Sequence, residues 1–339
     1  MSDAAVELEV DGRVVRVTSP DKVYFPRLGL TKLDVIDYFL AVSPAVLNAL
    51  GDRPILLQRF PSGVDGNNFF QKRIPDSAPE WLETTTVETP NGTPSRALVL
   101  HDAAHLVWAV NLGAFVLHAW PNRMPSFDVD ELRIDLDPTK GVSFNDVRQA
   151  AFDSRVLLAQ LGLESWVKTS GSKGLHVYVP VGPGWNGFQV RGAAVALARR
   201  LAAKHSTTMT NAWWKEERGQ RVFVDFNQNA PHKTVFGAWS VRPRVGAQVS
   251  TPVTWADLET VEPDSLTVET VPARFDATGD PWASMYSRPQ DISQLVAEFE
   301  SDLETLGDAP WPPVYPKQPH EPPRVAPSRA KKSGQGSNE

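Results

Sequence analysis

The stretch Glu-Leu-Arg-Ile-Asp-Leu-Asp-Pro, residues 131 to 138, decides how the rest of the chain is interpreted. Apolar and polar residues alternate along it, and a period of two predicts a β-strand. Successive side chains leave a strand on opposite faces, so Asp135 and Asp137 share one face and the apolar residues share the other. Pro138 cannot continue the ladder of hydrogen bonds and ends the strand.

Two carboxylates on one strand face repel each other unless a cation or a shared proton lies between them. The pattern therefore predicts a divalent metal site built from oxygen ligands, of the kind that Mg²⁺ or Mn²⁺ prefers. An alternative is a solvated strand end that runs into a turn, since Asp and Pro are common turn residues.

Composition excludes several classes of protein. The 339 residues include no cysteine, which excludes disulfides, zinc–thiolate sites and a cysteine nucleophile. The first residues are acidic and lack a long apolar run, and no stretch has the length of a membrane span. We expect a soluble, cytoplasmic and nucleoid-associated protein that does not contact membranes. The net charge of −6 gives no global sign of nucleic-acid binding, which would need a local basic surface.

A third acid, Asp225, lies in the apolar strand pattern Val-Phe-Val-Asp-Phe. A buried carboxylate without a partner is costly, so Asp225 needs one. A metal ion shared with Asp135 and Asp137 would supply it. A salt bridge to a neighbouring arginine is the alternative.

The segment Ser170-Gly-Ser-Lys173-Gly joins two strand patterns, and His176 begins the second of them. Backbone amides, hydroxyl groups and a lysine at one turn have the chemistry of a phosphate-binding loop. The spacing differs from a Walker A motif, and no helix follows. A plain hairpin with a flexible tip is the alternative.

Basic and aromatic residues in the first third of the chain suggest contacts with nucleic acid. Lys22 and Lys32 flank a helix start that Thr31 caps, where amide groups favour a phosphate. Ordinary surface charge is the alternative, and it is the commoner case for exposed lysines.

The run Phe69-Phe70-Gln-Lys72-Arg73 could stack on bases and contact phosphates, or could be core beside surface. His118, in an apolar strand pattern, could be a core histidine or a site residue. Later in the chain, Thr234 to Arg242 predicts a further strand on which Ser240 and Arg242 share a face. From residue 309 the chain is rich in proline and then in lysine, glycine and serine, which predicts a disordered tail over 309–339.

The order Asp-Leu-Asp, Ser-Gly-Ser-Lys-Gly-Leu-His and Val-Phe-Val-Asp-Phe resembles the three motifs of the archaeo-eukaryotic primase-polymerases. The closer resemblance is to the polymerase domain of bacterial ATP-dependent DNA ligase D and its stand-alone actinobacterial relatives. It covers residues 18 to 290 and includes Gln-Arg-Phe-Pro, Phe-Phe-Gln-Lys and Trp-Ser-Val-Arg-Pro-Arg.

The resemblance implies a mixed α/β fold within residues 1–308. An N-terminal α/β unit, about residues 1–125, would bind DNA ends. It would pack on a catalytic unit, about residues 126–290, which has an RRM-like sheet flanked by helices. A C-terminal helix would follow at 291–308. The implied activity is template-dependent addition of nucleotides, with ribonucleotides favoured, to a primer 3′-hydroxyl during gap filling in DNA repair or end joining. Two Mn²⁺ or Mg²⁺ ions would serve as cofactors and nucleoside triphosphates as substrates.

The resemblance also implies roles for particular residues. Asp135, Asp137 and Asp225 would be the catalytic metal ligands. Residues implied to bind the nucleotide are Arg59, His118, Ser170, Lys173, His176, Gln228, Ser240 and Arg242. Residues implied to bind DNA are Lys22, Lys32, Phe69, Phe70, Lys72 and Arg73. Ser19 and Gln58 depart from the family pattern, where an asparagine and a basic residue are usual.

Two other functions fit parts of the pattern. Asp-Leu-Asp-Pro-Thr also matches haloacid-dehalogenase phosphatases, in which Asp135 would be the nucleophile and Asp137 the general acid. A non-catalytic module that binds DNA ends would need only the basic and aromatic residues. For the polymerase we expect a monomer whose partners are a primer–template with a 5′-phosphorylated gap and a separate DNA ligase or end-joining factors.

Overall fold

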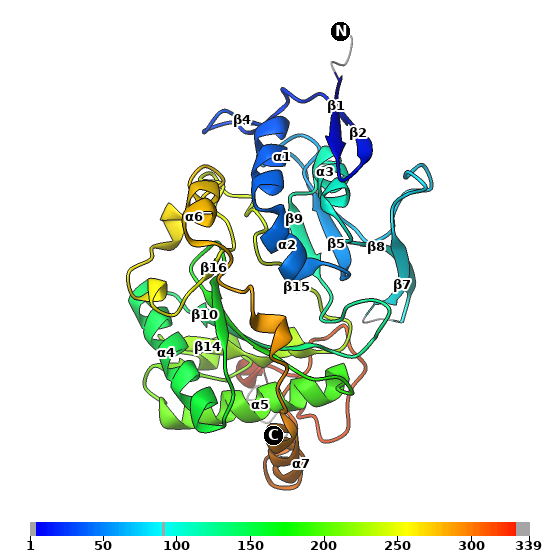
Figure 1. Ribbon diagram of the computed structural model, residues 1–339. Coiled ribbons are helices and arrows are strands. Elements are labelled where there is room, and N and C mark those ends of the chain that lie inside the picture. The colour runs from blue at the N-terminus through cyan, green and yellow to red at the C-terminus, as the bar shows by residue number, and fades with distance from the viewer. Residues whose placement is uncertain (1–4, 90–91, 330–339) are drawn as a thin grey trace, which may run out of the picture.

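The computed structural model describes residues 5–89 and 92–329, which fold around two six-stranded β-sheets. In Figure 1 the sheet from the first part of the chain lies in the upper half, and the sheet that carries the acidic strand lies below it. One apolar core runs through both halves. The described residues therefore form one packed body around the two six-stranded sheets, with the two-stranded sheets β1-β2 and β3-β4 beside them.

The lower sheet has the strand order β13-β14-β10-β12-β11-β16. Its strands are β10 (Glu131–Pro138), β11 (Trp166–Thr169), β12 (Leu175–Pro180), β13 (Met209–Thr210), β14 (Val222–Asp225) and β16 (Pro252–Val253). β10, β12, β11 and β14 pair antiparallel, and β13 joins β14 in parallel. Along the chain, the helices α4 (Phe144–Gln160) and α5 (Gly187–Lys204) alternate with the strands in the order β10-α4-β11-β12-α5-β14. Within the sheet, the four central strands lie in the order β14-β10-β12-β11, which is the split βαβ arrangement. The expected RRM-like sheet is confirmed.

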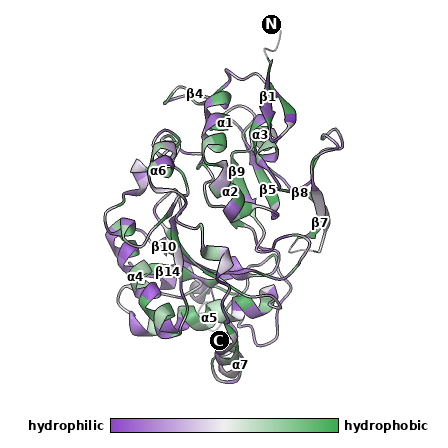
Figure 2. Ribbon diagram, viewed as in Figure 1, coloured by the Kyte–Doolittle hydropathy of each residue, from purple (hydrophilic) through white to green (hydrophobic). Residues whose placement is uncertain are grey.

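Helices α4 and α5 cover one face of this sheet and contact β10 (Figure 1). The apolar side chains of β10 are buried, as the alternating pattern predicts: Leu132, Ile134 and Leu136. Ser143 caps α4 with Asp146, and the hydropathy colouring of Figure 2 shows both apolar and polar positions along these helices. The opposite face of β10 is left to the acids.

The upper sheet has the order β15-β9-β5-β8-β7, and β6 also pairs with β5. Its strands are β5 (Pro54–Arg59), β6 (Phe69–Gln71), β7 (Thr84–Glu88), β8 (Pro94–Val99), β9 (Val116–Ala119) and β15 (Val235–Phe236). β15 comes from the second half of the chain and pairs with β9. A simple division near residue 125 therefore does not hold, because a later segment completes the first sheet.

Hairpins and helices cover the upper sheet. The elements are β1 (Ala5–Val10), β2 (Arg13–Thr18), β3 (Val23–Phe25), β4 (Leu30–Thr31), α1 (Lys32–Ala41), α2 (Ser43–Leu50) and α3 (Ala103–Asn111). Asp11 and Gly12 both have positive φ at the turn between β1 and β2, as a tight hairpin requires. Thr31 and Asp34 form the expected capping box at the start of α1.

A buried ionic network joins the two halves. The Arg53 guanidinium, which is 0% exposed, donates to Asp130 and to Glu131 on β10, and Glu131 also accepts from Arg133. Burial alone would raise the pKa of Glu131, but the two guanidinium groups outweigh burial and hold that pKa at about 2. The start of β5 is therefore tied to the start of β10 through opposite charges that satisfy each other.

The C-terminal part differs from the expectation. After α6 (Val271–Thr278) and α7 (Ser293–Leu306), the chain does not become disordered at residue 309. Trp311 and Tyr315 are buried against the lower sheet's helices and turns, and Glu321 is 7% exposed. The aromatic residues between the prolines supply apolar area that the composition of the tail obscured. Residues 330–339 lie outside the described part of the chain.

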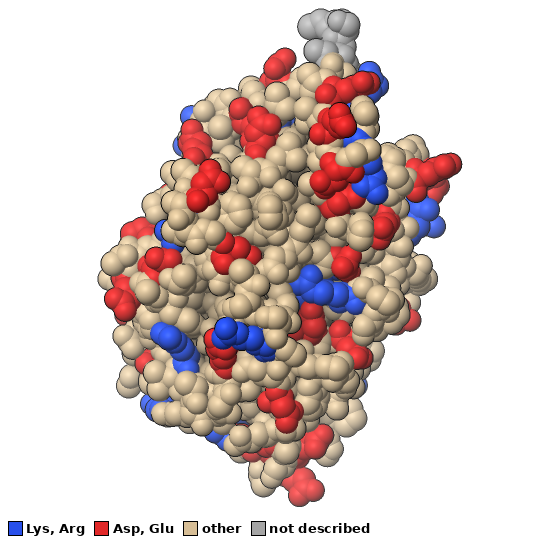
Figure 3. Space-filling model, in the orientation of Figure 1, with Lys and Arg blue, Asp and Glu red and all other residues tan. Residues whose placement is uncertain are grey.

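Within residues 5–89 and 92–329, no single helix is long and apolar enough to cross a membrane, and α1 with α2 passes such a test only as a pair bent by 72°. On the face shown in Figure 3, acidic side chains are scattered over the whole surface, and several basic side chains lie among them, including some near its middle.

Candidate active site

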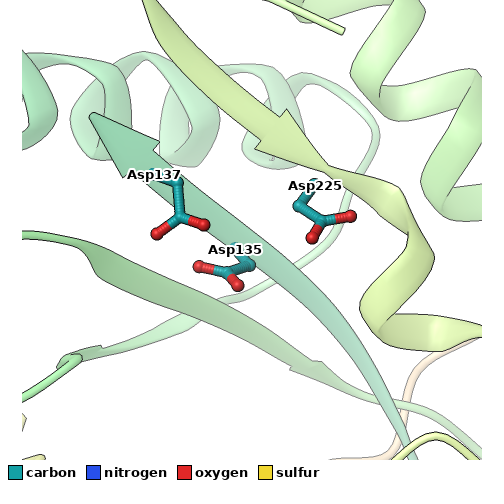
Figure 4. A group of neighbouring side chains, drawn as sticks. All are labelled: Asp135, Asp137 and Asp225. Atoms are coloured by element: carbon teal, nitrogen blue, oxygen red, sulfur yellow. The ribbon is translucent and has the colours of Figure 1, made fainter. Parts of the chain in front are cut away.

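Three acids meet where β10 and β14 lie side by side. Asp135 and Asp137 lie on β10, and Asp225 ends β14 directly opposite Asp135 in the strand register. One carboxylate oxygen of each acid lies within 4.8 Å of those of the other two. Figure 4 shows the three carboxylates turned toward one another. The structure thus brings together the three acids that the sequence predicts as metal ligands.

The electrostatics of this cluster call for a cation. Burial and the neighbouring acids raise the pKa of Asp135 well above its ordinary value, and burial raises the pKa of both Asp137 and Asp225. Oδ1 of Asp135 has no hydrogen-bond donor within the described part of the chain. Three converging carboxylates with an unused, buried oxygen fit a divalent metal site of hard oxygen ligands.

The turn after β14 orients Asp225. The Asn227 amide donates to Asp225 Oδ1 at 2.9 Å, and the Gln228 side-chain amide donates to Oδ2 at 2.8 Å. Both residues belong to the short helix η2 (Phe226–Asn229). Gln228, expected to bind the nucleotide, therefore also orients Asp225, one of the three predicted metal ligands.

The loop Ser170–Gly174 lies directly against the end of β10. A Cβ atom on Gly174 would lie 2.8 Å from the Leu136 carbonyl oxygen and 3.3 Å from Asp137 Oδ1, so only glycine permits this approach. The amides of Ser172 and Gly174 donate to Ser170 Oγ rather than into open space. The loop is thus held in shape by its own hydrogen bonds, and the Lys173 side chain within it is exposed.

Arg242 lies over this loop. Its Nε donates to the Ser170 carbonyl oxygen at 2.6 Å, and its Cζ is 3.5 Å from the ring centre of Phe236. Burial lowers the pKa of Arg242 to about 10, so the guanidinium stays charged at neutral pH. Its planar fork is held between a carbonyl group and an aromatic face, beside the acids.

Ser240 does not share a strand face with Arg242, which corrects the sequence prediction. The predicted strand 234–242 is reduced to β15, because the chain turns after Phe236 and Trp239 has a φ of +65°. Ser240 is fully buried and donates to the Leu117 carbonyl oxygen. Its role in this structure is to tie the turn to β9.

His176 and Lys168 lie in a row with Asp135 across three neighbouring strands. His176 Nε2 is 3.4 Å from Asp135 Oδ1, without hydrogen-bond geometry. Burial, followed by the charges of Lys168 and Arg242, lowers the pKa of His176 well below its ordinary value, so its ring is neutral. Lys168 is fully buried and donates to Ser250 Oγ.

A cavity of about 700 Å³ opens above these residues and has walls from both sheets. From the lower sheet and its loops come Asp135, Asp137, Ser170, Lys173, His176, Gln228 and Arg242. From the upper sheet come Leu56, Phe70, Lys72, His118 and Phe236. The His118 ring lies 5.5 Å from that of Phe70 and 5.6 Å from that of Phe236, and burial lowers its pKa to about 4.

Other residues predicted for the site lie outside this cavity lining. Arg59 donates to the Leu112 carbonyl and to Gln71, and its guanidinium is 5.3 Å from the ring of Phe69. Phe69 and Arg73 are exposed on and beside β6. The cavity therefore holds one part of the predicted set, and the β6 surface holds another.

The two lysines predicted to bind a 5′-phosphate differ in environment. Lys22 is exposed, but Lys32 is only 4% exposed. The Lys32 ammonium donates to the Thr18 carbonyl and to Asn111 Oδ1. Lys32 therefore supports the packing of β2, α1 and α3 whether or not it also meets a ligand.

Sequence reasoning missed some of the cavity residues. Lys233 and Phe236 line the cavity from the segment that returns to β9, and Lys168 is buried beneath it. A lysine within the apolar strand Trp-Val-Lys-Thr, two residues before Ser170, was a signal for a buried charge near the loop. Phe236 gave no such signal, because only tertiary pairing places it opposite His118.

Comparisons with known proteins agree with this geometry. The model of the LigD primase-polymerase domain family matches residues 31–282. The multifunctional non-homologous end joining protein LigD of Mycolicibacterium smegmatis is 33% identical over 315 residues, covering 89% of this chain and 40% of that protein. The LigD protein of the same description from Pseudomonas aeruginosa is 30% identical over 289 residues, covering 83% of this chain and 34% of that protein.

A solved structure, the polymerase domain of Mycobacterium tuberculosis ligase D in complex with DNA, superposes with a TM-score of 0.76 at 32% identity. The match covers 81% of this chain and 99% of that domain. This chain spans less than half of the length of the curated relatives that it matches. The chain therefore belongs to the LigD primase-polymerase domain family, and as a polymerase domain it is a nucleotidyltransferase.

Proposed function

We propose that this chain extends the 3′ end of a primer on a DNA template with nucleoside triphosphates, using divalent metal ions bound by Asp135, Asp137 and Asp225. The relatives are described as end-joining proteins, and a matching polymerase domain is described in complex with DNA. On this basis we propose short gap filling at broken DNA ends as the setting.

The observation that carries the proposal is the convergence of three carboxylates, of which that of Asp135 is buried, beside a glycine-rich loop and an arginine. Alone, such a cluster would be destabilised by repulsion. Beside a cavity of about 700 Å³ with cationic groups on its walls, it suits a triphosphate carried in with its metal ions.

Bound divalent ions would lower the pKa of the primer 3′-hydroxyl and neutralise charge on the triphosphate. The chain's own residues would position the reactants. Arg242, Lys173 and Lys233 surround the cavity with positive charge for the phosphate oxygens. Gln228 and the Asn227 amide hold Asp225 in place before any ligand arrives.

The upper sheet offers contacts for DNA. Phe69 and Phe70 are 47% and 52% exposed, and apolar rings exposed on neighbouring residues suit base stacking. We propose that Lys72 and Arg73 contact the backbone there and that Lys22 meets a downstream 5′-phosphate. A monomer in the cytoplasm that hands its product to a separate ligase, with a preference for ribonucleotides and Mn²⁺, completes the proposal.

Primer extension tests the proposal. A gapped duplex with a labelled primer should be extended when Mn²⁺ or Mg²⁺ is present, with each ribo- and deoxyribonucleotide tested singly. The variants Asp135→Ala, Asp137→Ala and Asp225→Ala should lose several orders of magnitude in rate while still binding the duplex. An exposed acid elsewhere provides the matched control, Asp264→Ala, which should act as wild type.

Extension at near wild-type rate by any triad variant would overturn the assignment of the metal ligands. A phosphatase of the haloacid-dehalogenase type would instead form an aspartyl-phosphate on Asp135 and add no nucleotide. A binding module would retain the duplex and add no nucleotide with any metal ion.

A further inference from the structure

Residues 308–324, which we call the C-terminal strap, pack on the turn that follows Asp225. Asp308 is buried and accepts from Arg191 on α5 at 2.9 Å and from the Trp311 indole at 2.6 Å. The Trp311 ring lies 3.8 Å from the Arg191 guanidinium. Glu321 closes the strap on itself by accepting from the Trp311 amide.

The strap holds the turn at two points. The first is Asn227, whose side chain donates to the Pro310 carbonyl at 2.9 Å and accepts from Arg191 Nε at 2.9 Å. The second is Pro231, whose carbonyl accepts from the Tyr315 hydroxyl at 2.8 Å. Between these two points lies Gln228, which faces the cavity.

The same turn is also held by β10. Asn229 is buried, accepts from the Arg133 amide at 2.8 Å and donates to the Arg133 carbonyl at 2.7 Å. A short 3₁₀ segment has little intrinsic stability, so such tertiary contacts set its conformation. The strap and β10 therefore both hold the turn, through different residues of it.

The conformation of this turn decides where the third carboxylate points. Both oxygens of Asp225 accept from the turn, one from the Asn227 amide and one from Gln228. The Asn227 side chain that the strap holds and the Asn227 amide that holds Asp225 belong to one residue. Asn227 therefore connects the strap directly to the carboxylate of Asp225.

We infer that the C-terminal strap is a positioning element of the active site, which fixes the 226–231 turn and through it Asp225 and Gln228. The inference rests on the proposed role of Asp225 as a metal ligand. Removing the contacts between the strap and the turn should weaken metal binding at the three acids while leaving the two six-stranded sheets and the proposed DNA-binding surface intact.

The test uses the full chain with Trp311→Ala, which removes the ring on Arg191 and the hydrogen bond to Asp308. Mn²⁺ binding without nucleotide, followed by the electron paramagnetic resonance signal of free Mn²⁺, should weaken by about tenfold, and kcat for primer extension should fall by about tenfold. KM for the primer–template should not change. Trp311→Phe, which keeps a ring on Arg191, should recover part of the loss.

Asp302→Ala is the matched control, because it breaks the Arg199–Asp302 ion pair between α5 and α7 without touching the turn. Equal Mn²⁺ affinity in Trp311→Ala and wild type would overturn the inference and leave the strap a stabilising segment only. If Trp311→Ala does not fold, Tyr315→Phe decides. It removes one hydroxyl and should weaken Mn²⁺ binding by about threefold, an effect of one hydrogen bond, and unchanged affinity would overturn the inference.

The two proposals fail in different ways. Wild-type chain that neither binds Mn²⁺ nor extends a primer would remove the proposed function and the inference with it. Wild-type chain that does both, beside strap variants with the same Mn²⁺ affinity, would remove only the inference.

Discussion

Replacing Gly174 by alanine should displace Asp137 without unfolding the protein. The new Cβ would lie 2.8 Å from the Leu136 carbonyl oxygen, 0.6 Å short of the 3.4 Å at which ordinary contact begins. The obstructing atom belongs to the backbone of β10, so the loop and the strand end must move apart. Misplacing catalytic groups by 1 Å can cost about a hundredfold, so a shift of this size should lower kcat by roughly tenfold, or about 1.4 kcal/mol.

Single-nucleotide primer extension under saturating Mn²⁺ and nucleotide measures this effect, and thermal unfolding measures the overpacking, for which we expect about 1–3 kcal/mol. Gly182→Ala is the matched control, because a Cβ there would meet nothing within 4 Å. A folded Gly174→Ala variant with kcat within twofold of wild type would refute the reasoning, since Asp137 would then not depend on the close approach of the loop.

Three further predictions concern charged residues. Glu131→Gln should lower the free energy of unfolding by about 3 kcal/mol at neutral pH. Arg53 and Arg133 hold the pKa of Glu131 at about 2, against an ordinary 4.5, so the difference in stability between wild type and variant should shrink as pH falls from 4.5 toward 2. Urea titrations measure this difference, and a difference that stays constant with pH would contradict the prediction. Lys22→Ala should weaken binding to a 5′-phosphorylated gap more than binding to a 5′-hydroxyl gap, as measured by fluorescence titration. Lys32→Ala should in addition lower Tm, because the Lys32 ammonium is buried. An unchanged Tm would count against a structural role for Lys32. Arg242→Lys should raise KM for every nucleotide and lower kcat, since an ammonium cannot replace the planar fork, and kinetics equal to wild type would show that the fork is not used.

The catalytic sheet could be predicted from the sequence because its signals are local. The alternation around Asp135 fixes which side chains share a face, and the capping boxes at Thr31 and Ser143 mark helix starts to the residue. The register of β10 with β14, which sets Asp225 opposite Asp135, is a long-range pairing that no local pattern specifies. Resemblance to known motifs supplied that link.

The failures of sequence reasoning share one physical cause. Ser240 and Arg242 were expected on one strand face, but a turn with a positive φ at Trp239 separates them. Lys32 has the chemistry of a surface cation, yet the packing of β2 and α3 around it buries its ammonium. The turn at Trp239 is itself held by distant residues, because the Trp239 amide donates to the Ser250 carbonyl and the Val241 amide to the Phe115 carbonyl. In both cases a distant segment, which a local pattern does not contain, decides the environment.

The prediction of a disordered tail from residue 309 was wrong for a related reason. Composition counts Pro, Lys and Ser as evidence of disorder, because such residues bury little apolar area. Trp311 and Tyr315 are only two residues, but they meet an already folded surface formed by α5 and the turn at Pro231. A segment that docks on a finished domain needs far fewer apolar residues than one that must build its own core.

The cavity owes its shape to the way the two halves are joined. Its floor of acids belongs to the lower sheet, and its aromatic wall of Phe70, His118 and Phe236 belongs to the upper one. Phe236 lies on β15, a strand that the chain contributes to the upper sheet only after completing the acid triad in the lower one. After Asp225 the chain thus continues through the 226–231 turn, which the C-terminal strap holds, and reaches Phe236 in the aromatic wall of the cavity. One segment carries both Asp225, the proposed metal ligand, and the aromatic wall residue Phe236, so the distance between floor and wall is set by covalent connection as well as by packing. Substitutions in residues 226–236 should therefore affect metal binding and nucleotide selection together.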